Sequence, residues 1–227
     1  ITDFGVHPFW ISKGTDLYVV ASDFTRDKLL AEGIEPEKIK VFGLPSDAKF
    51  LQQFDRVSLA GKFGIRPDKF TVLLMTGSFG IGALEKLAEL LCRDAQVLVV
   101  CATNKNLYDR LRRKNLPNVK AFGFVNNAEE LMGVCDIIIT KPGGSTIAEI
   151  LNMELVPVFI SVIPGQEEGN VEALEQFGIS STPNGLEEIK DAVLDFKNHP
   201  EKLREIRMRI QKIKKPLSCQ ELSDVIR

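Results

Sequence analysis

The sequence is poor in the residues that most often hold metals or form disulfide frameworks. Among its 227 residues there are two histidines, His7 and His199, and four cysteines without a Cys-x-x-Cys spacing. A metal site built from several histidines is therefore excluded. The cysteines lie in apolar or helical patterns, which is typical of a reduced, cytosolic protein; they are Cys92, Cys101, Cys135 and Cys219.

Long apolar runs and a surplus of charge are also missing. No stretch approaches the roughly 18 apolar residues of a membrane span. The net charge is −2, with 44% hydrophobic and 26% charged residues. This composition predicts a soluble globular protein and gives no support to a nucleic-acid partner.

Several catalytic motifs are absent as well. The sequence has no Gly-x-Ser-x-Gly, no His-Glu-x-x-His and no Asp-x-Asp. The last absence counts against enzymes that hold a metal ion through paired aspartates. We therefore expect neither a metal nor a cofactor.

Short apolar runs alternate with amphipathic stretches over residues 70–182. We expect strands at 70–77, 96–102, 119–125, 135–140, 155–161 and 178–182, with helices between them and two closing helices at 184–197 and 199–214. Strands that are apolar throughout indicate parallel pairing with both sheet faces covered. The sequence thus predicts an α/β fold with a Rossmann-like, doubly wound parallel sheet.

The pattern of apolar and polar residues changes on either side of this region. Residues 1–53 contain two strand-like runs around a helix with an N-cap at Ser22 or Asp23, typical of the end of a preceding, incomplete α/β domain. Residues 54–69 are polar with Gly and Pro and are interpreted as a linker, 70–215 as the C-terminal domain and 216–227 as a terminal helix. The chain opens without Met, so we expect a fragment of a longer protein.

The loops that follow the strands are the candidate ligand-binding segments, because ligands of open α/β sheets bind at the strand ends. The loop "MTGSFGIG" (75–82) contains Gly77, Ser78 and Gly80. Its spacing matches neither a dinucleotide fingerprint nor a P-loop, and a tight strand-to-helix turn explains it equally well.

The stretch "TKPGGSTIAE" (140–149) is more informative. Gly143 and Gly144 let another group approach the backbone, and Ser145 and Thr146 fall in the first helical turn, where free N–H groups and the helix dipole favour an anion. Glu149 follows one turn later. An ordinary capped helix is the alternative.

Two further strand ends are candidates. "PGQEEGN" (164–170) supplies Gln166, Glu167 and Asn170, which suit sugar hydroxyls but are also common in solvated loops. "AFGFVNN" (121–127) places Phe124 and Val125 where they can pack into a core or hold a flat base.

The order of these motifs resembles the C-terminal half of GT-B glycosyltransferases. A Gly-rich loop, "GFV", "KPGGSTIAE" and "PGQEEGN" follow one another as in the monogalactosyldiacylglycerol synthase and processive diacylglycerol glucosyltransferase group, which is related to MurG. The opening "TDFGVHPFW" and "VFGLP" at 41–45 resemble the end of that group's N-terminal domain.

The resemblance implies a donor site for a UDP-sugar. Phe124 and Val125 are expected at the uracil, and Glu149 at the ribose hydroxyls. The residues expected around the diphosphate are Gly77, Ser78, Gly80, Gly143, Gly144, Ser145 and Thr146. The residues expected at the hexose are Gln166 and Glu167, with Asn170 supporting them.

The resemblance also implies inverting transfer of a hexose from UDP-glucose or UDP-galactose to a lipid acceptor such as diacylglycerol. The cytoplasmic enzyme would contact the membrane surface peripherally. The main base is expected in the missing N-terminal part, so this chain alone should bind donor without catalysing transfer. His7 is expected on the acceptor side, as a structural or catalytic residue.

Alternatives remain open from the sequence. A UDP-sugar epimerase of the same fold acts on the sugar without a lipid, and a non-catalytic nucleotide-sugar-binding module would need no acceptor. The basic, amphipathic stretch 201–216 is typical of a helix that closes an α/β domain, and also of a helix at a membrane interface.

Overall fold

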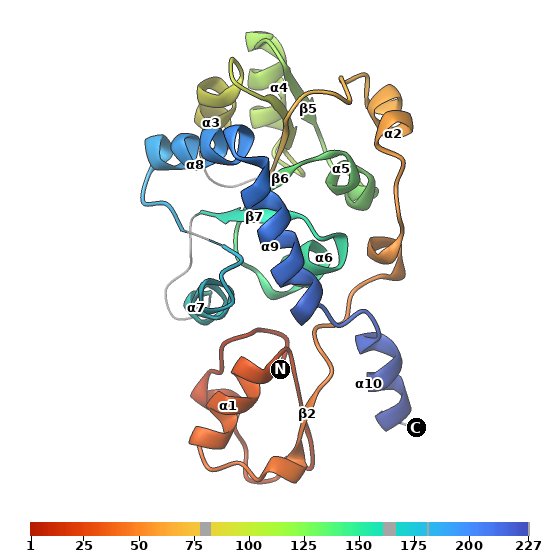
Figure 1. Ribbon diagram of the computed structural model, residues 1–227, viewed down its shortest axis with the longest axis vertical. Helices are drawn as coiled ribbons and strands as arrows, with labels where there is room; N and C mark the ends of the chain where they lie inside the picture. Colours follow the sequence, from red (N-terminus) through yellow and green to blue (C-terminus); the bar gives the residue numbers. More distant parts are fainter. Residues whose placement is uncertain (78–82, 161–166, 181, 227) are drawn as a thin grey trace.

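The computed structural model describes residues 1–77, 83–160, 167–180 and 182–226. Its main sheet has the strand order β5-β4-β3-β6-β7, and every neighbouring pair is parallel. The strands are β3 (Thr71–Met75), β4 (Gln96–Val100), β5 (Val119–Phe122), β6 (Ile137–Thr140) and β7 (Val156–Phe159). A second, two-stranded sheet lies nearer the N-terminus (Figure 1).

Both faces of the main sheet are buried, because alternate strand residues enter two different cores. Leu73 and Ile138 pack with α5 (Ala128–Val134), α6 (Gly144–Met153) and α9 (Pro200–Ile213). Val72 and Ile137 pack on the opposite face with α3 (Leu84–Leu91), α4 (Lys105–Lys114) and α8 (Leu186–Asn198). The predicted doubly wound α/β fold is confirmed.

The covering helices form where apolar residues recur at helical spacing. In α3, Leu84, Leu87, Ala88 and Leu91 are all fully buried, which is the i, i+3, i+4, i+7 pattern of one helix face. Hydrophobic burial thus fixes which side of α3 faces the sheet.

The N-terminal unit has the expected strand-helix-strand order. β1 (Tyr18–Val20) and β2 (Ile39–Val41) pair in parallel, and α1 (Asp23–Ala31) connects them. Ser22 is the N-cap of α1, with its hydroxyl accepting the Thr25 N–H at 3.4 Å. Short 3-10 helices precede β1, precede β2 and follow β2: η1 (Pro8–Trp10), η2 (Pro36–Lys38) and η3 (Ala48–Leu51).

The segment interpreted as a linker, 54–69, contains a helix. α2 (Arg56–Phe63) begins at the N-cap Asp55 and ends at Gly64 in the left-handed conformation. The Arg56 guanidinium donates to both Asp136 carboxylate oxygens, at 2.7 and 2.9 Å, and so fastens α2 to the start of β6. The helix and this contact were not predicted from the sequence, because the partner of Arg56 lies far away in it.

The strand expected at 178–182 does not form at residues 178–180 and 182. Gly178, with φ +64°, and Ile179 instead close the C-terminus of α7 (Glu168–Gln176). Their N–H groups donate to the carbonyls of Glu175 at 2.8 Å and Leu174 at 2.9 Å, the two bonds of a Schellman motif. The buried Ile179 belongs to this motif, so its apolar character reflects a helix end.

The chain closes as expected with α8, α9 and a short helix, α10 (Ser218–Ile226). α9 buries Leu203 and Ile210 against the main sheet, which favours the closing-helix interpretation of 201–216. α10 leaves the main sheet and reaches the segment after β2, where the Ser218 hydroxyl donates to the Leu44 carbonyl at 3.0 Å (Figure 1). None of the described helices has both the length and the apolar composition needed to cross a membrane.

Asp136→Asn should lower the free energy of unfolding by about 2 kcal/mol, because the variant removes the charge that a half-buried guanidinium requires. Urea unfolding measures the change. Asp68→Asn is the matched control, since the Arg66–Asp68 pair is exposed; equal effects of the two variants would contradict the role of Arg56 and Asp136.

Candidate functional site

The sheet order creates a switch point between β3 and β6. The chain runs from β3 outward to β4 and β5 and then returns to β6 on the other side of β3. The chain therefore continues from β3 and from β6 to helices on opposite faces of the sheet, α3 and α6, and ligands of such sheets bind near the two loops at these strand ends. Gly77, with φ +80°, lies in the first loop; Ser78, Gly80 and Gln166 lie outside the described residues.

The second loop leads into α6, whose first turn is uncapped. Gly143 is the N-cap residue, and no side chain caps the helix among the described residues. The N–H groups of Gly144, Ser145 and Thr146 precede the first intrahelical bond, from Ile147 N–H to Gly143 O at 2.9 Å. These donors and the helix dipole make the turn suitable for an anion.

A second segment of the chain comes close to this turn. A Cβ atom on Gly144 would lie 2.1 Å from the Thr2 carbonyl oxygen and 2.7 Å from Asp3 Oδ1. Only glycine fits there, so the requirement for Gly144 comes from the approach of residues 2–3. Asp3 beside α6 is a feature that the sequence reasoning missed.

Asn170 holds this arrangement together. Its side chain is fully buried, and its amide Nδ2 donates to Asp3 Oδ1 at 2.7 Å and to the Pro142 carbonyl at 2.9 Å. Its Oδ1 accepts the Phe4 N–H at 2.6 Å. Asn170 thus bonds to both the N-terminal segment and the loop before α6, and its amide donors are used within the protein.

The same two segments meet at a pair of glycines. A Cβ atom on Gly5 would lie 2.9 Å from Gly169 Cα, so the backbones approach more closely than any side chain permits. "TDFG" and "EEGN", which are far apart in the sequence, therefore form one junction. Glu167, at the N-cap of α7, is 8% exposed beside it.

Glu149 lies on α6, is half-buried, and is close enough to three charged side chains for them to shift its pKa. Burial raises the pKa of its carboxyl to about 7, with further raising by Glu129 and Asp47, while Lys49 acts in the opposite direction. A carboxylate with such a pKa can accept hydrogen bonds from hydroxyl groups once it is ionised.

The loop after β5 lies on the same side as Glu149. Phe124 is 73% exposed, whereas Val125 packs against the core. Lys49 Nζ donates to the Asn126 carbonyl at 3.1 Å and forms an ion pair with Glu129 Oε2 at 3.2 Å. The same lysine therefore contacts the Phe124 loop and acts electrostatically on Glu149.

His7 lies in the N-terminal segment, where its ring contacts its neighbours in the sequence, Phe9 and Trp10. Its Nδ1 accepts the Phe9 N–H at 3.3 Å and caps η1, and its ring centroid lies 5.9 Å from that of Trp10. With Nδ1 accepting, the hydrogen of the neutral ring is on Nε2. Within the described residues, no group of three or more His, Cys, Asp or Glu side chains is placed to hold a metal ion.

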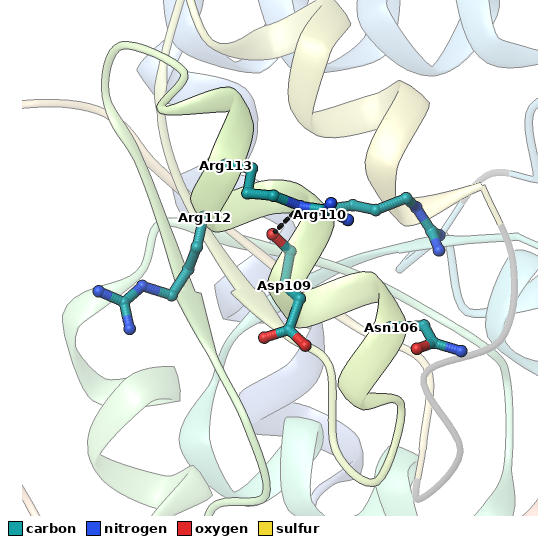
Figure 2. Close-up of a pocket in the computed structure, with 5 residues that line it drawn as sticks. All are labelled: Asn106, Asp109, Arg110, Arg112 and Arg113. Carbon is teal, nitrogen blue, oxygen red and sulfur yellow. Dashed lines mark hydrogen bonds between the residues drawn. The ribbon is translucent and has the colours of Figure 1, made fainter.

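A cavity of about 610 Å³ lies elsewhere, along α4 (Figure 2). The described residues that line it all belong to this helix: Asn106, Asp109, Arg110, Arg112 and Arg113. Arg110 is paired with Glu85 at 2.7 Å, and Arg113 Nε donates to the Asp109 carbonyl at 3.2 Å. None of the described residues that line this cavity is among the predicted site residues.

Comparison with solved structures confirms the fold. Anabaena HepE in complex with UDP and glucose has a TM-score of 0.62 at 18% identity, covering 93% of this chain and 62% of that one. MurG of Acinetobacter baumannii gives 0.61 at 16% identity, covering 91% and 63%. UDP-GlcNAc 2-epimerase of Neisseria meningitidis, bound to UDP-GlcNAc, gives 0.69 at 13% identity, covering 93% and 60%. At these identities the likeness concerns the fold alone.

The family follows from the sequence matches. The protein-family model "Glycosyltransferase family 28 C-terminal domain" matches residues 71–218 of the sequence, and the family model "Monogalactosyldiacylglycerol (MGDG) synthase" matches residues 1–45. The chain belongs to glycosyltransferase family 28, which confirms the resemblance described above.

Curated relatives agree with this assignment. The processive diacylglycerol beta-glucosyltransferase of Bacillus licheniformis is 32% identical over 219 residues, covering 94% of this chain and 57% of the relative. The protein of the same name from Bacillus subtilis is 33% identical over 199 residues, covering 85% and 52%. The chain thus spans little more than half the length of these relatives.

Asn170→Ala should lower the free energy of unfolding by about 3 kcal/mol, because it leaves the buried Phe4 N–H and Pro142 carbonyl without partners. Urea unfolding gives the change. Asn152→Ala is the control, since the half-buried Asn152 amide makes one bond to the side chains that the structure describes, to the Ser46 hydroxyl at 2.7 Å. A loss no larger than that of the control would show that Asn170 does not hold the junction.

Glu149→Gln should change how stability depends on pH. A folded-state pKa of about 7, against 4.5 for an ordinary glutamate, means that the folded chain binds the proton more tightly. The contribution of Glu149 is then full below pH 4.5, falls as the pH rises to about 7, and stays constant above that.

The glutamine side chain does not titrate, so the free energy of unfolding of the variant should rise relative to that of the original chain between about pH 5 and pH 7.5. This range is roughly the window between the two pKa values. Urea unfolding across that range, with Glu187→Gln on the exposed start of α8 as control, is the measurement. A difference that is independent of pH would contradict the raised pKa.

Proposed function

We propose that this chain forms the donor side of an inverting glycosyltransferase, which moves a hexose from a UDP-sugar to a lipid hydroxyl. The observation that carries the proposal is the uncapped first turn of α6 at the switch point, with Glu149 one turn further, in a chain of glycosyltransferase family 28. The fold alone is shared with epimerases, but the curated relatives are diacylglycerol glucosyltransferases. They therefore favour transfer over epimerisation.

In this proposal the diphosphate binds at the start of α6. The N–H groups of Gly144, Ser145 and Thr146 donate to its oxygens, with Gly143 and the loop containing Gly77, Ser78 and Gly80 along the cleft. During transfer, the acceptor oxygen bonds to the anomeric carbon, the bond from that carbon to the phosphate oxygen breaks, and UDP leaves with the electron pair. The preoriented donors stabilise the charge that develops on UDP. The proposal includes no metal ion.

The uridine extends from α6 toward the loop after β5. Phe124, with its exposed ring, and the backbone around Val125 would hold the uracil, and the ionised Glu149 would accept hydrogen bonds from the ribose hydroxyls. The hexose would extend toward α7, with its hydroxyls bound by Gln166 and Glu167. Asn170 would act there indirectly, by fixing the first turn of α7.

The acceptor is proposed to approach from the side of His7. Nε2–H of this histidine can donate to an acceptor hydroxyl, and the exposed Phe9 and Trp10 offer apolar surface for a lipid such as diacylglycerol at a membrane surface. The acceptor proton passes to a general base on that side. Because the chain alone is expected to bind donor without transferring it, the test uses the full-length protein: label should pass from UDP-glucose or UDP-galactose to diacylglycerol, and release of free sugar alone would contradict the proposal.

Calorimetric titration of the chain tests the donor site. UDP, UDP-glucose and UDP-galactose should bind, and ADP should bind at least about tenfold more weakly, because the site reads the base as well as the phosphates. Glu149→Ala should weaken UDP binding by about tenfold or more, equivalent to about 1.4 kcal/mol.

Glu187→Ala, an exposed glutamate of α8, is the matched control and should leave UDP binding unchanged. Equal affinity for ADP and UDP, or full UDP affinity in Glu149→Ala, would refute the assignment of the nucleoside site.

A further inference from the structure

We infer that Lys49 is a positioning residue of the donor site, which holds the loop after β5 and offsets the negative charge around Glu149. The inference rests on the proposed function, because the site that Lys49 serves is the proposed uridine site. Lys49 lies in η3, within the part of the sequence that precedes the five-stranded sheet.

The position of Lys49 is fixed by its own segment. Asp47 caps η3, with its Oδ1 accepting the Lys49 backbone N–H at 3.0 Å, and the adjacent Phe50 is buried in the core. η3 packs against α6, and Figure 1 shows this orange segment beside α6 and below α5. The ammonium group therefore extends from an anchored turn.

From there the ammonium group makes two contacts that matter to the site. Nζ donates to the Asn126 carbonyl at 3.1 Å, in the loop that presents Phe124 and Val125. It also pairs with Glu129 Oε2 at 3.2 Å; this oxygen is buried and accepts no hydrogen bond from the described residues. Lys49 thus supplies the positive charge that balances Glu129, and it also holds the loop after β5, which is proposed to bind the base.

Three carboxylates share this corner of the structure. Among the described residues, the titratable groups that act on Glu149 are Lys49 from η3, Asp47 at the N-cap of η3 and Glu129 from α5. The two acids raise the pKa of the Glu149 carboxyl and Lys49 lowers it, although burial is the largest influence. Without Lys49, Glu149 would keep its proton to higher pH and accept ribose hydroxyls less readily at neutral pH.

Calorimetric titration with UDP between about pH 5.5 and 8.5 tests the inference, because ionisation of Glu149 should appear as a midpoint in affinity near its pKa. In Lys49→Gln the midpoint should move up, and affinity at pH 7 should fall about three- to tenfold, as for a shift of about one pKa unit. Glu129→Gln should move the midpoint down. The double variant should lie near the original chain, and Lys49→Arg should keep most of the affinity.

Lys62→Gln is the matched control. Lys62 also pairs with an acid of α5, Glu130 at 2.5 Å, but its charge is not among those that act on Glu149. UDP protonation is common to all variants, so differences between them report the protein.

The possible outcomes separate the two proposals. If the original chain binds UDP and the midpoint is the same in Lys49→Gln, Glu129→Gln and Lys62→Gln, the role of Lys49 is refuted while the donor site stands. If the original chain binds no UDP at any pH, the proposed function fails and this inference fails with it. Should Lys49→Gln not fold, the direction of the shift in Glu129→Gln still decides, since an unchanged or raised midpoint contradicts the charge balance.

Discussion

The buried amide of Asn170 is the interaction on which the geometry of the site depends. It joins the Phe4 N–H, the Asp3 carboxylate and the Pro142 carbonyl, which belong to the N-terminal segment and to the loop before α6. An amide in that position can satisfy all three groups only at one separation of α7, the loop and the N-terminal segment. The first turns of α6 and α7 are therefore fixed relative to each other, and both follow neighbouring strands β6 and β7.

The same junction sets the electrostatics of the α6 turn. Asp3 brings a carboxylate next to a helix N-terminus, where a negative charge is favoured. A diphosphate bound at Gly144, Ser145 and Thr146 would share that helix field with Asp3. The Asn170 amide donates to Asp3 Oδ1, so this carboxylate oxygen is already hydrogen-bonded within the protein, which stabilises its negative charge beside the helix N-terminus.

The sequence predicts those features that depend on local pattern. Buried strands such as "TVLLM", the helical spacing of α3 and the uncapped Gly-Gly-Ser-Thr turn of α6 each follow from neighbouring residues. The contacts of Asp3 with Asn170, of Arg56 with Asp136 and of Lys49 with Glu129 depend on tertiary approach, and a single sequence carries no sign of them. The error at 178–182 has a local cause: an apolar residue that ends a helix looks the same as one that begins a short strand.

Both ends of the candidate site depend on the part of the chain that precedes the main sheet. At the proposed sugar and phosphate end, Asp3 and Phe4 bond to Asn170; at the proposed nucleoside end, Lys49 bonds to the Asn126 carbonyl. These contacts are short and polar, so a displacement of about an ångström breaks them. A shift of residues 2–4 would therefore alter the α6 turn, and a shift of η3 would alter the Phe124 loop. The proposed donor site thus depends on two segments that precede the main sheet, although the described residues proposed to hold the nucleotide follow strands of that sheet.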